Sequence, residues 1–338
     1  MVTRRKFIRN TAVGTAGIAV LSKLGWAAGV QGQKISRVVK VVNPDVVDSR
    51  TGEVNKKILR QMIDQAVMTL SGKKKLSRAW AEFIPKGKRI GLKINTLGLR
   101  SVKNTGWTSH FTAMTDTLTS SLKSTGVTED QLVIWDRSEA ELQAAGYTIQ
   151  KEPGKTRVIA TFSNRRDPGY GYSDEDYPVG DKTSRVARIL TDQCDVMINI
   201  PLIKDHRIAG FTGSLKQHYG TIDNPGSMHH NRCSGPGIAE VNAIPVIREK
   251  QKLILVDGLL GVIQGGPVWN ISSIRAFHCV IAGTDPVAVD RIMLDMLEKQ
   301  RADNGLEPLG DRVVHLGLAQ KLGLGTAQPD QIDLIEIV

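Results

Sequence analysis

The amino-acid sequence predicts an α/β fold with a largely parallel sheet and helices on both of its faces. Apolar runs alternate along the chain with segments of helical periodicity, which is the pattern of successive βαβ units. Runs such as V-M-I-N-I, L-I-L-V and C-V-I-A are nearly continuously apolar and rich in β-branched residues, as strands buried on both faces are. The 338 residues, 41% of them hydrophobic, can bury such a core without disulfide bonds.

Each apolar run is assigned a strand and each helical pattern a helix. The strands are expected at Arg37–Val42, Arg89–Ile94, Gln131–Trp135, Arg157–Thr161, Asp195–Ile200, Lys252–Val256, Ala276–Ile281 and Ile332–Ile337. The helices are expected at Asn55–Leu70, Thr112–Ser124, Ser138–Ala145, Ser184–Thr191, Ile238–Lys250 and Pro286–Lys299. Asp285 is the expected N-cap of the last helix, and Pro245 is expected to interrupt the helix that begins at Ile238. The stretches 163–181 and 206–236 are predicted to be loops, the second being too polar for the core.

The first residues have the composition of an export signal. A basic segment, T-R-R-K-F-I-R, precedes a weakly apolar run of 12 residues and then a cluster of small residues. The paired arginines resemble the twin-arginine export motif, so residues 1–28 are expected to be a signal peptide cleaved near Ala27 or Ala28. The partner would be the twin-arginine translocation machinery and the location periplasmic. The apolar run is shorter than the ~20 residues of a membrane span, so no stable span is expected, with an uncleaved anchor as the alternative.

The remaining chain, 34–338, is expected to form a single α/β domain, with two lobes as the alternative. The net charge of the whole sequence is +11, but removal of the five cations of the signal, Arg4, Arg5, Lys6, Arg9 and Lys23, lowers it to +6. Basic clusters such as 73–75 have no interleaved aromatic residues that would stack on bases. No nucleic-acid partner is therefore expected.

Cysteine usage excludes several kinds of site. The chain has three cysteines, Cys194, Cys233 and Cys279, and no C-x-x-C pair. This pattern indicates neither a disulfide framework nor a cysteine zinc site, and no iron–sulfur cluster is expected. Cys194 and Cys279 are expected in the core, and Cys233 is the one candidate for reactivity.

Polar side chains stand at the ends of four predicted strands: Asn95, Asp136, Asn199 and Asp257. The carboxyl ends of parallel strands meet at one edge of a sheet, where ligands bind. A turn residue or helix cap is the simpler interpretation of each residue alone. The four together favour a shared site.

The segment that follows Asn199 carries the densest chemistry. Lys204 and His206 are followed by Thr212 and Gly213, and then by Lys216 and His218. A glycine-rich backbone that opens a helix near Ser214, flanked by two lysines, is expected to hold a small anion through amide groups and the helix dipole. The spacing is not that of a Walker loop.

Imidazole and carboxylate groups in the same region suggest a divalent metal ion. The candidate ligands are His206, His218, His229 and Asp257. Adjacent residues such as His229 and His230 do not normally point the same way, so at most one of them is expected to be a ligand. A hydrogen-bonded loop or core histidine is the alternative for each.

These segments resemble an uncharacterised family known as domain of unknown function 362. The resemblance runs from Lys34 to Leu297 and is carried by P-L-I-K-D-H at 201–206, T-G-S-L-K-Q-H-Y-G at 212–220 and T-D-P-V-A-V-D at 284–290, with K-I-N at 93–95, T-S-H at 108–110 and G-G-P at 265–267. Asp205 stands where threonine is common, and Gln217 where asparagine is common. An acid at 205 could pair with Lys204 or add a metal ligand. Some relatives carry ferredoxin-like iron–sulfur modules, and the family name implies no reaction.

The sequence as a whole predicts an exported enzyme of unknown reaction, with its site at the carboxyl ends of the strands. Lys204 and Lys216 would hold an anionic group, and His206 or His218 would exchange a proton or bind a metal. A nucleophilic role for a desolvated Lys204 is an alternative. A second hypothesis uses the same residues in a non-catalytic metal- or ligand-binding protein, or in a maturation factor for an exported redox protein.

Overall fold

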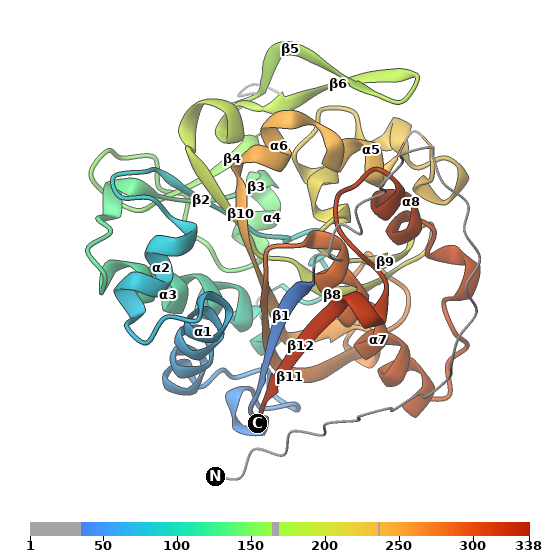
Figure 1. Ribbon diagram of the computed structural model, residues 1–338, viewed down its shortest axis with the longest axis horizontal. Helices are drawn as coiled ribbons and strands as arrows, with labels where there is room; N and C mark the ends of the chain where they lie inside the picture. The colour runs from blue at the N-terminus through green and yellow to red at the C-terminus, as the bar shows by residue number, and fades with distance from the viewer. Residues whose placement is uncertain (1–34, 104, 164–168, 236) are drawn as a thin grey trace, which may run out of the picture. The chain divides into compact units, whose positions relative to one another are not determined.

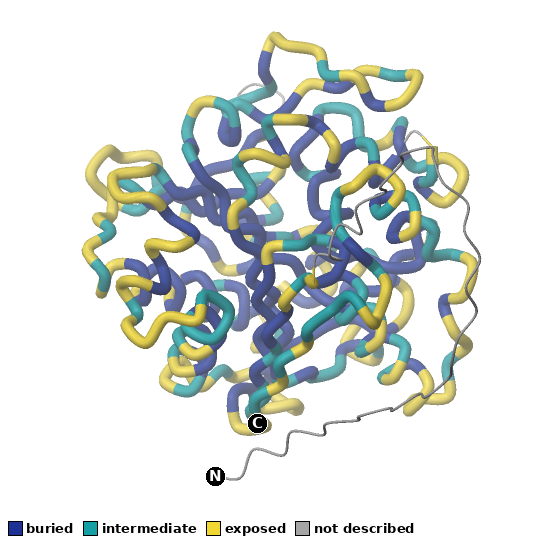
Figure 2. Tube along the Cα trace, in the orientation of Figure 1, coloured by how far each residue is buried: buried dark blue, intermediate teal, exposed yellow. Residues whose placement is uncertain are grey.

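Strand β10 (Gln251–Val262) is buried on both faces. Leu253 and Leu255 belong to the core on one side of the sheet, and Ile254 and Val256 to the core on the other, because side chains alternate along a strand. Figure 2 shows this buried chain running through the centre of the fold. The computed structural model describes residues 35–103, 105–163, 169–235 and 237–338. The predicted signal peptide, 1–28, lies outside the described residues.

The main sheet is largely parallel, as predicted. Among the described residues it has ten strands in the order β12-β1-β11-β10-β7-β2-β3-β4, with β8 paired to β10 and β9 to β8. Only β11 and β9 run against the others. Its strands are β1 Ser36–Val42, β2 Ile90–Lys93, β3 Leu132–Ser138, β4 Arg157–Phe162, β7 Val196–Asn199, β8 Leu202–His206, β9 Gly210–Thr212, β10, β11 Ile274–Gly283 and β12 Ile332–Ile337. A separate hairpin joins β5 Tyr172–Val179 to β6 Lys182–Ala187.

Helices cover both faces of the sheet. The helices α1 Lys56–Ser71, α2 Leu76–Phe83, α3 Ser109–Lys123 and α4 Glu139–Ala144 contribute to the core on one face. The opposite face is covered by α5 Ile238–Ala243, α6 Pro245–Lys250, α7 Pro286–Asp303 and α8 His315–Lys321. Figure 1 shows α1, α2 and α3 on one side of β1 and β10, and α5, α7 and α8 on the other. In the described part of the chain, no helix combines the length and apolar character needed to span a membrane.

Most predicted elements are present, and the errors have local causes. The eight predicted strands correspond to β1, β2, β3, β4, β7, β10, β11 and β12, and Pro245 separates α5 from α6 as expected. The helix predicted at Ser184–Thr191 is wrong, because strand β6 occupies its first half and a π-helix, Ile189–Gln193, follows. The prediction of loop over 163–181 is wrong for its last part, which forms β5.

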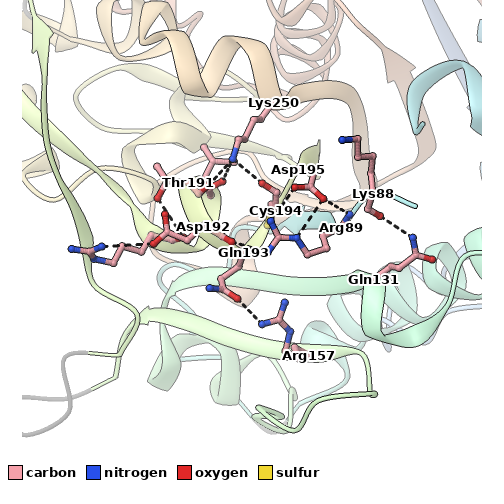
Figure 3. Close-up of polar contacts among 12 residues, drawn as sticks. Lys88, Arg89, Gln131, Arg157, Thr191, Asp192, Gln193, Cys194, Asp195 and Lys250 are labelled. Atoms are coloured by element: carbon pink, nitrogen blue, oxygen red, sulfur yellow. Dashed lines mark hydrogen bonds and ion pairs between the residues drawn. The ribbon is translucent and has the colours of Figure 1, made fainter. Parts of the chain in front are cut away.

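The π-helix is fixed by two cations at its carboxyl end (Figure 3). The ammonium of Lys250 donates to the main-chain oxygens of Leu190, Thr191 and Cys194 at 2.7–2.8 Å. Arg89 donates to the oxygen of Asp192 at 2.7 Å and pairs with Asp195 at 2.9 Å. Cations here satisfy carbonyl groups that the helix leaves free. They tie the π-helix to the starts of β2 and β7, at the edge of the sheet opposite the predicted site.

The prediction that 206–236 is too polar for the core is wrong for the first half of this stretch. Residues 210–219 are all buried, and they include β9 and all but the last residue of a 3₁₀ turn, Lys216–Gly220. Several of their polar groups form hydrogen bonds within the protein, as most buried polar groups do. For example, Gln217 Nε2 donates to the main-chain oxygens of Lys93 and Ile200 at 2.9 and 3.0 Å.

Gly213 allows this buried segment to approach α7 closely. A Cβ atom at this position would lie 2.4 Å from Asp290 Oδ1 and 2.5 Å from the ring of Phe211. The carboxylate of Asp290 accepts hydrogen bonds from the amides of Ser214 and Leu215 at 2.5 and 3.1 Å. A larger residue at 213 would therefore displace the carboxylate that fixes the segment.

We predict that Gly213→Ala lowers the free energy of unfolding by about 1–3 kcal/mol, because the added methyl group overpacks this contact. The control is Gly317→Ala in α8, where the added Cβ meets open space and where alanine should raise helix stability by up to about 1 kcal/mol. Urea denaturation measures both. Equal stability of the Gly213→Ala variant and the wild type would contradict the close contact.

Candidate functional site

A cavity of about 640 Å³ opens at the carboxyl ends of β2 and β3, beside β8. This is the edge of a parallel sheet where ligands bind. The lining comes from the strand ends, from β8, β9 and the turn after β9, and from the start of β5: Lys93, Asn95, Leu97, Asp136, Arg137, Ser138, Glu141, Phe162, Tyr172, Lys204, His206, Thr212, Lys216, Gln217, Tyr219, Gly220, Asp223, Pro225, His229 and Pro267. Of the predicted strand-end residues, Asn95 and Asp136 line the cavity.

Strand β8 places Lys204 and His206 on the cavity wall. Both belong to the lining, and the intervening Asp205 does not, because successive side chains point to opposite faces of a strand. Asp205 Oδ2 accepts a hydrogen bond from the amide of Gly266 at 3.1 Å, and Oδ1 lies 3.7 Å from Arg301 and 3.8 Å from Arg312. The acid at 205 therefore pairs with arginines on the far side of β8 instead of pairing with Lys204.

Lys93 and Asp136 form a buried ion pair between the ends of β2 and β3. The Lys93 ammonium lies 2.7 Å from Asp136 Oδ1. The carboxylate also accepts hydrogen bonds at 2.7 Å from the amide and hydroxyl of Thr96 and from the amide of Arg137. Burial raises the pKa of Asp136, but Lys93 and Thr96 outweigh burial and bring the pKa below its usual value. This lysine is therefore neutralised within the protein.

Lys204 and Lys216 are not neutralised in this way. Lys204 is fully buried, and its ammonium donates to the main-chain oxygen of Leu97 at 3.1 Å. The ammonium of Lys216 lies 3.1 Å from His229 Nε2 and 3.8 Å from the centre of the Tyr219 ring. Neither lysine pairs with a carboxylate of the described residues, and burial lowers the pKa of each to about 8.

Hydrogen bonds determine the tautomers of the two cavity histidines. His206 Nδ1 lies 3.2 and 3.1 Å from the amides of Ile208 and Ala209, so it accepts and the ring proton is on Nε2. His229 Nδ1 lies 2.7 Å from the oxygen of Pro225, so it donates, and its bare Nε2 accepts from Lys216. Burial and the positive charge of Lys216 lower the pKa of both rings, that of His206 to about 2. Both imidazoles are therefore neutral near pH 7.

Three of the predicted site residues lie behind the cavity wall and do not line it. His218 is fully buried and bonds to Gln251 Oε1 at 2.9 Å and Thr221 Oγ1 at 3.2 Å. Asn199 donates to the same Gln251 oxygen at 2.7 Å and to the main-chain oxygen of Ser214 at 3.0 Å. Gly213 packs against α7. These residues support the wall from behind.

The structure gives different hydrogen-bond donors for an anion from those predicted. The amides of Ser214 and Leu215, expected to bind it, are occupied by Asp290. Thr212 is a different candidate donor, since the residue belongs to the cavity lining and its buried hydroxyl has no hydrogen-bond partner among the described residues. A buried hydroxyl without a partner is a costly arrangement that a ligand oxygen would relieve.

The four predicted metal ligands do not come together as one group: only His206 and His229 are neighbours, with ring centroids 5.6 Å apart. His206 and His229 line the cavity, whereas His218 bonds to Gln251, and Asp257 Oδ2 is 2.6 Å from His110 Nδ1 in the core. In the described ranges, no three or more histidine, cysteine, aspartate or glutamate side chains are grouped so as to hold a metal ion. The geometry therefore gives the metal hypothesis no support.

Several cavity residues were not indicated as site residues by the sequence patterns: Lys93, Arg137, Glu141, Tyr172 and Tyr219. A signal for Lys93 was present, since it is a lone cation inside the apolar run I-G-L-K-I at 90–94. A charge inside a buried strand needs a partner or a function. The pairing of Lys216 with His229 had no such signal, because it depends on how a 13-residue connection folds.

The buried lysines predict a pH dependence of stability. Each has an ordinary pKa of 10.5 and a pKa of about 8 in the folded protein, so between these values the unfolded chain binds more protons. The free energy of unfolding should therefore rise as the pH increases from about 8 to 10.5. Urea denaturation across this range should show the rise in the wild type and a smaller one in the Lys204→Met, Lys216→Met double variant. Parallel curves for the wild type and the double variant would mean that burial does not lower the pKa values of these two lysines.

Comparisons with known proteins bear on the family. A family model described as Domain of unknown function (DUF362) matches residues 90–295, which is more than half of the chain. No curated protein matched the sequence. Among solved structures, the crystal structure of a Thermotoga maritima protein is similar with a TM-score of 0.41 and 13% identity, covering 81% of this chain and 60% of that chain.

Proposed function

The chain belongs to the family of domain of unknown function 362, and we propose that it is an enzyme that binds a small organic anion and transfers a proton to or from it. The observation that carries this proposal is the presence of two buried lysines, Lys204 and Lys216, on the wall of one cavity, with no carboxylate partner among the residues that the structure describes. A metal ion has no part in the proposal, because the predicted ligands do not lie together.

The anion is proposed to lie between the two ammonium groups. A buried charge is costly unless it is paired, and the lowered pKa of each lysine reflects that missing partner. A carboxylate or phosphate would supply it and would raise both pKa values. The Thr212 hydroxyl and the Nε2–H of His206 are further donors on the same wall. His206 remains neutral, so it would act as a hydrogen-bond donor to an oxyanion and not as a proton carrier.

Proton transfer is assigned to Lys216 with His229. In the ligand-free protein the pKa of Lys216 is about 8, and the bound anion would raise it, so Lys216 would be protonated near neutral pH and would act as the general acid. The bare Nε2 of His229 lies 3.1 Å away and is fixed toward Lys216 by the bond from Nδ1 to Pro225. His229 therefore orients the ammonium. The same residues would serve the non-catalytic binding or maturation protein considered above, and turnover distinguishes the two.

We predict that inorganic phosphate and acetate raise the melting temperature of the wild type and leave the Lys204→Met and Lys216→Met variants unchanged. A ligand at a hundredfold excess over its dissociation constant stabilises by about 2.7 kcal/mol. The control is Lys74→Met at an exposed position, which should respond as the wild type does. Binding should weaken as the pH rises through about 8, because both lysines lose their charge. Equal shifts in all four proteins would contradict the anion site.

The catalytic part of the proposal needs a separate measurement. A panel of small carboxylates incubated with the protein in D₂O, followed by proton NMR, should show loss of a C–H signal for at least one acid. Lys216→Met should abolish this exchange. Binding without exchange for every acid of the panel would favour the non-catalytic alternative.

We also propose that residues 1–28 direct export by the twin-arginine route. This proposal rests on the paired Arg4 and Arg5, the weakly apolar run and the small residues near Ala27. The Arg4→Lys, Arg5→Lys variant is expected to accumulate uncleaved in the cytoplasm, while the wild type appears in the periplasm with a new N-terminus near residue 28. Cell fractionation and N-terminal sequencing measure this, and equal export of both proteins would contradict it.

A further inference from the structure

We infer that the ligand of this cavity is amphiphilic, with its anionic group at Lys204 and Lys216 and an apolar body lying toward the mouth. The inference rests on the proposed anion site and adds the chemical class of the ligand. Three observations carry it: the size of the cavity, the exposed apolar side chains that line it, and the different depths of its charged and apolar groups.

The cavity is much larger than an anionic group alone requires. Its volume is about 640 Å³, whereas a water molecule occupies about 30 Å³ in the liquid. Cavities of roughly 300–1,000 Å³ are typical of sites that enclose a complete organic ligand. Most of the space therefore remains for the part of the ligand that carries no charge.

Large apolar side chains line the cavity and are exposed to solvent. Leu97, which follows β2, is 52% exposed, and Phe162, at the end of β4, is 45% exposed. Pro267 also lines the cavity, and the adjacent Val268 is 53% exposed. Single exposed apolar residues are ordinary on a protein surface, but their concentration around one cavity is typical of a binding site.

Leu97 separates the charged and apolar parts of the cavity. Its main-chain oxygen accepts the hydrogen bond from the fully buried Lys204, while its own side chain is more than half exposed. The ammonium is therefore deep and the leucine side chain is near the solvent. A ligand that satisfies both would enter with its charge first and leave its apolar body against Leu97 and Phe162.

The Leu97 wall is held in place by its neighbours. The amide of Trp269 donates to the oxygen of Gly98 at 3.0 Å, which joins the segment after β2 to the segment after Pro267. A Cβ atom on Gly98 would lie 2.5 Å from the oxygen of Pro267, and its φ is +91°. The apolar lining is thus part of a close contact between two segments and is preformed for a ligand.

The test compares acetate, hexanoate and adipate on the full-length protein by isothermal titration calorimetry. Each methylene that is buried on binding strengthens binding about fourfold, so hexanoate should bind at least tenfold tighter than acetate. Adipate has the same chain length but a second carboxylate at its far end, and it should bind at least tenfold more weakly than hexanoate. Leu97→Ser and Phe162→Ser should each weaken hexanoate binding at least threefold and leave acetate within twofold of the wild type.

The control variant is Leu322→Ser, an exposed leucine outside the cavity lining, which should bind all three acids as the wild type does. Equal affinity for acetate and hexanoate would overturn the apolar part of the inference and leave the anion site standing. Unchanged hexanoate binding in Leu97→Ser and Phe162→Ser would overturn it in the same way. Hexanoate binding that persists in the Lys204→Met, Lys216→Met double variant would overturn both the inference and the anion site.

Discussion

The buried pair of Lys93 and Asp136 determines how the charges of the cavity are distributed. Three buried ammonium groups line the cavity, those of Lys93, Lys204 and Lys216, and Asp136 neutralises the first of them. Without Asp136 the charge of Lys93 would also be uncompensated, because removal of one partner of a buried pair leaves the other charge unpaired. The carboxylate also accepts hydrogen bonds from the amide and hydroxyl of Thr96. Thr96 precedes Leu97, whose main-chain oxygen accepts the hydrogen bond from Lys204. One carboxylate thus neutralises one lysine and positions the acceptor of another. The anion site depends on both effects.

The segment that follows β9 is held by a second carboxylate. Asp290 on α7 binds the amides of Ser214 and Leu215, and burial raises its pKa to about 7. The glycine at 213 makes that approach possible. Lys216 comes directly after Leu215, so α7 positions this cavity lysine through the hydrogen bonds of Asp290. At the other edge of the sheet, Lys250 and Arg89 fix the π-helix, and neither of these residues lines the cavity.

The sequence predicted the sheet well because buried parallel strands are continuous apolar runs, as in β7 and β10. It predicted the site less completely. Strand β8 was overlooked because a strand with Lys204, Asp205 and His206 on it has no apolar alternation. Recognition of that strand would have placed Asp205 on the opposite face from Lys204, because successive side chains of a strand point to opposite faces. The buried turn after β9 was mistaken for a solvated loop, since hydrogen bonds to distant main-chain groups, such as those of Gln217, leave no pattern in the sequence.

The complete burial of Lys204 has a consequence for the order in which anions would be preferred. The ammonium group of Lys204 is not exposed to water, so an anion can pair with it only after losing the water molecules on the side that faces the ammonium. The cost of dehydration is greater for compact, multiply charged ions than for large ions with diffuse charge. The affinity of the site for an anion would therefore depend on the free energy of hydration of the anion as well as on its charge. Among ligands of equal charge, those that cost less to dehydrate would bind more tightly.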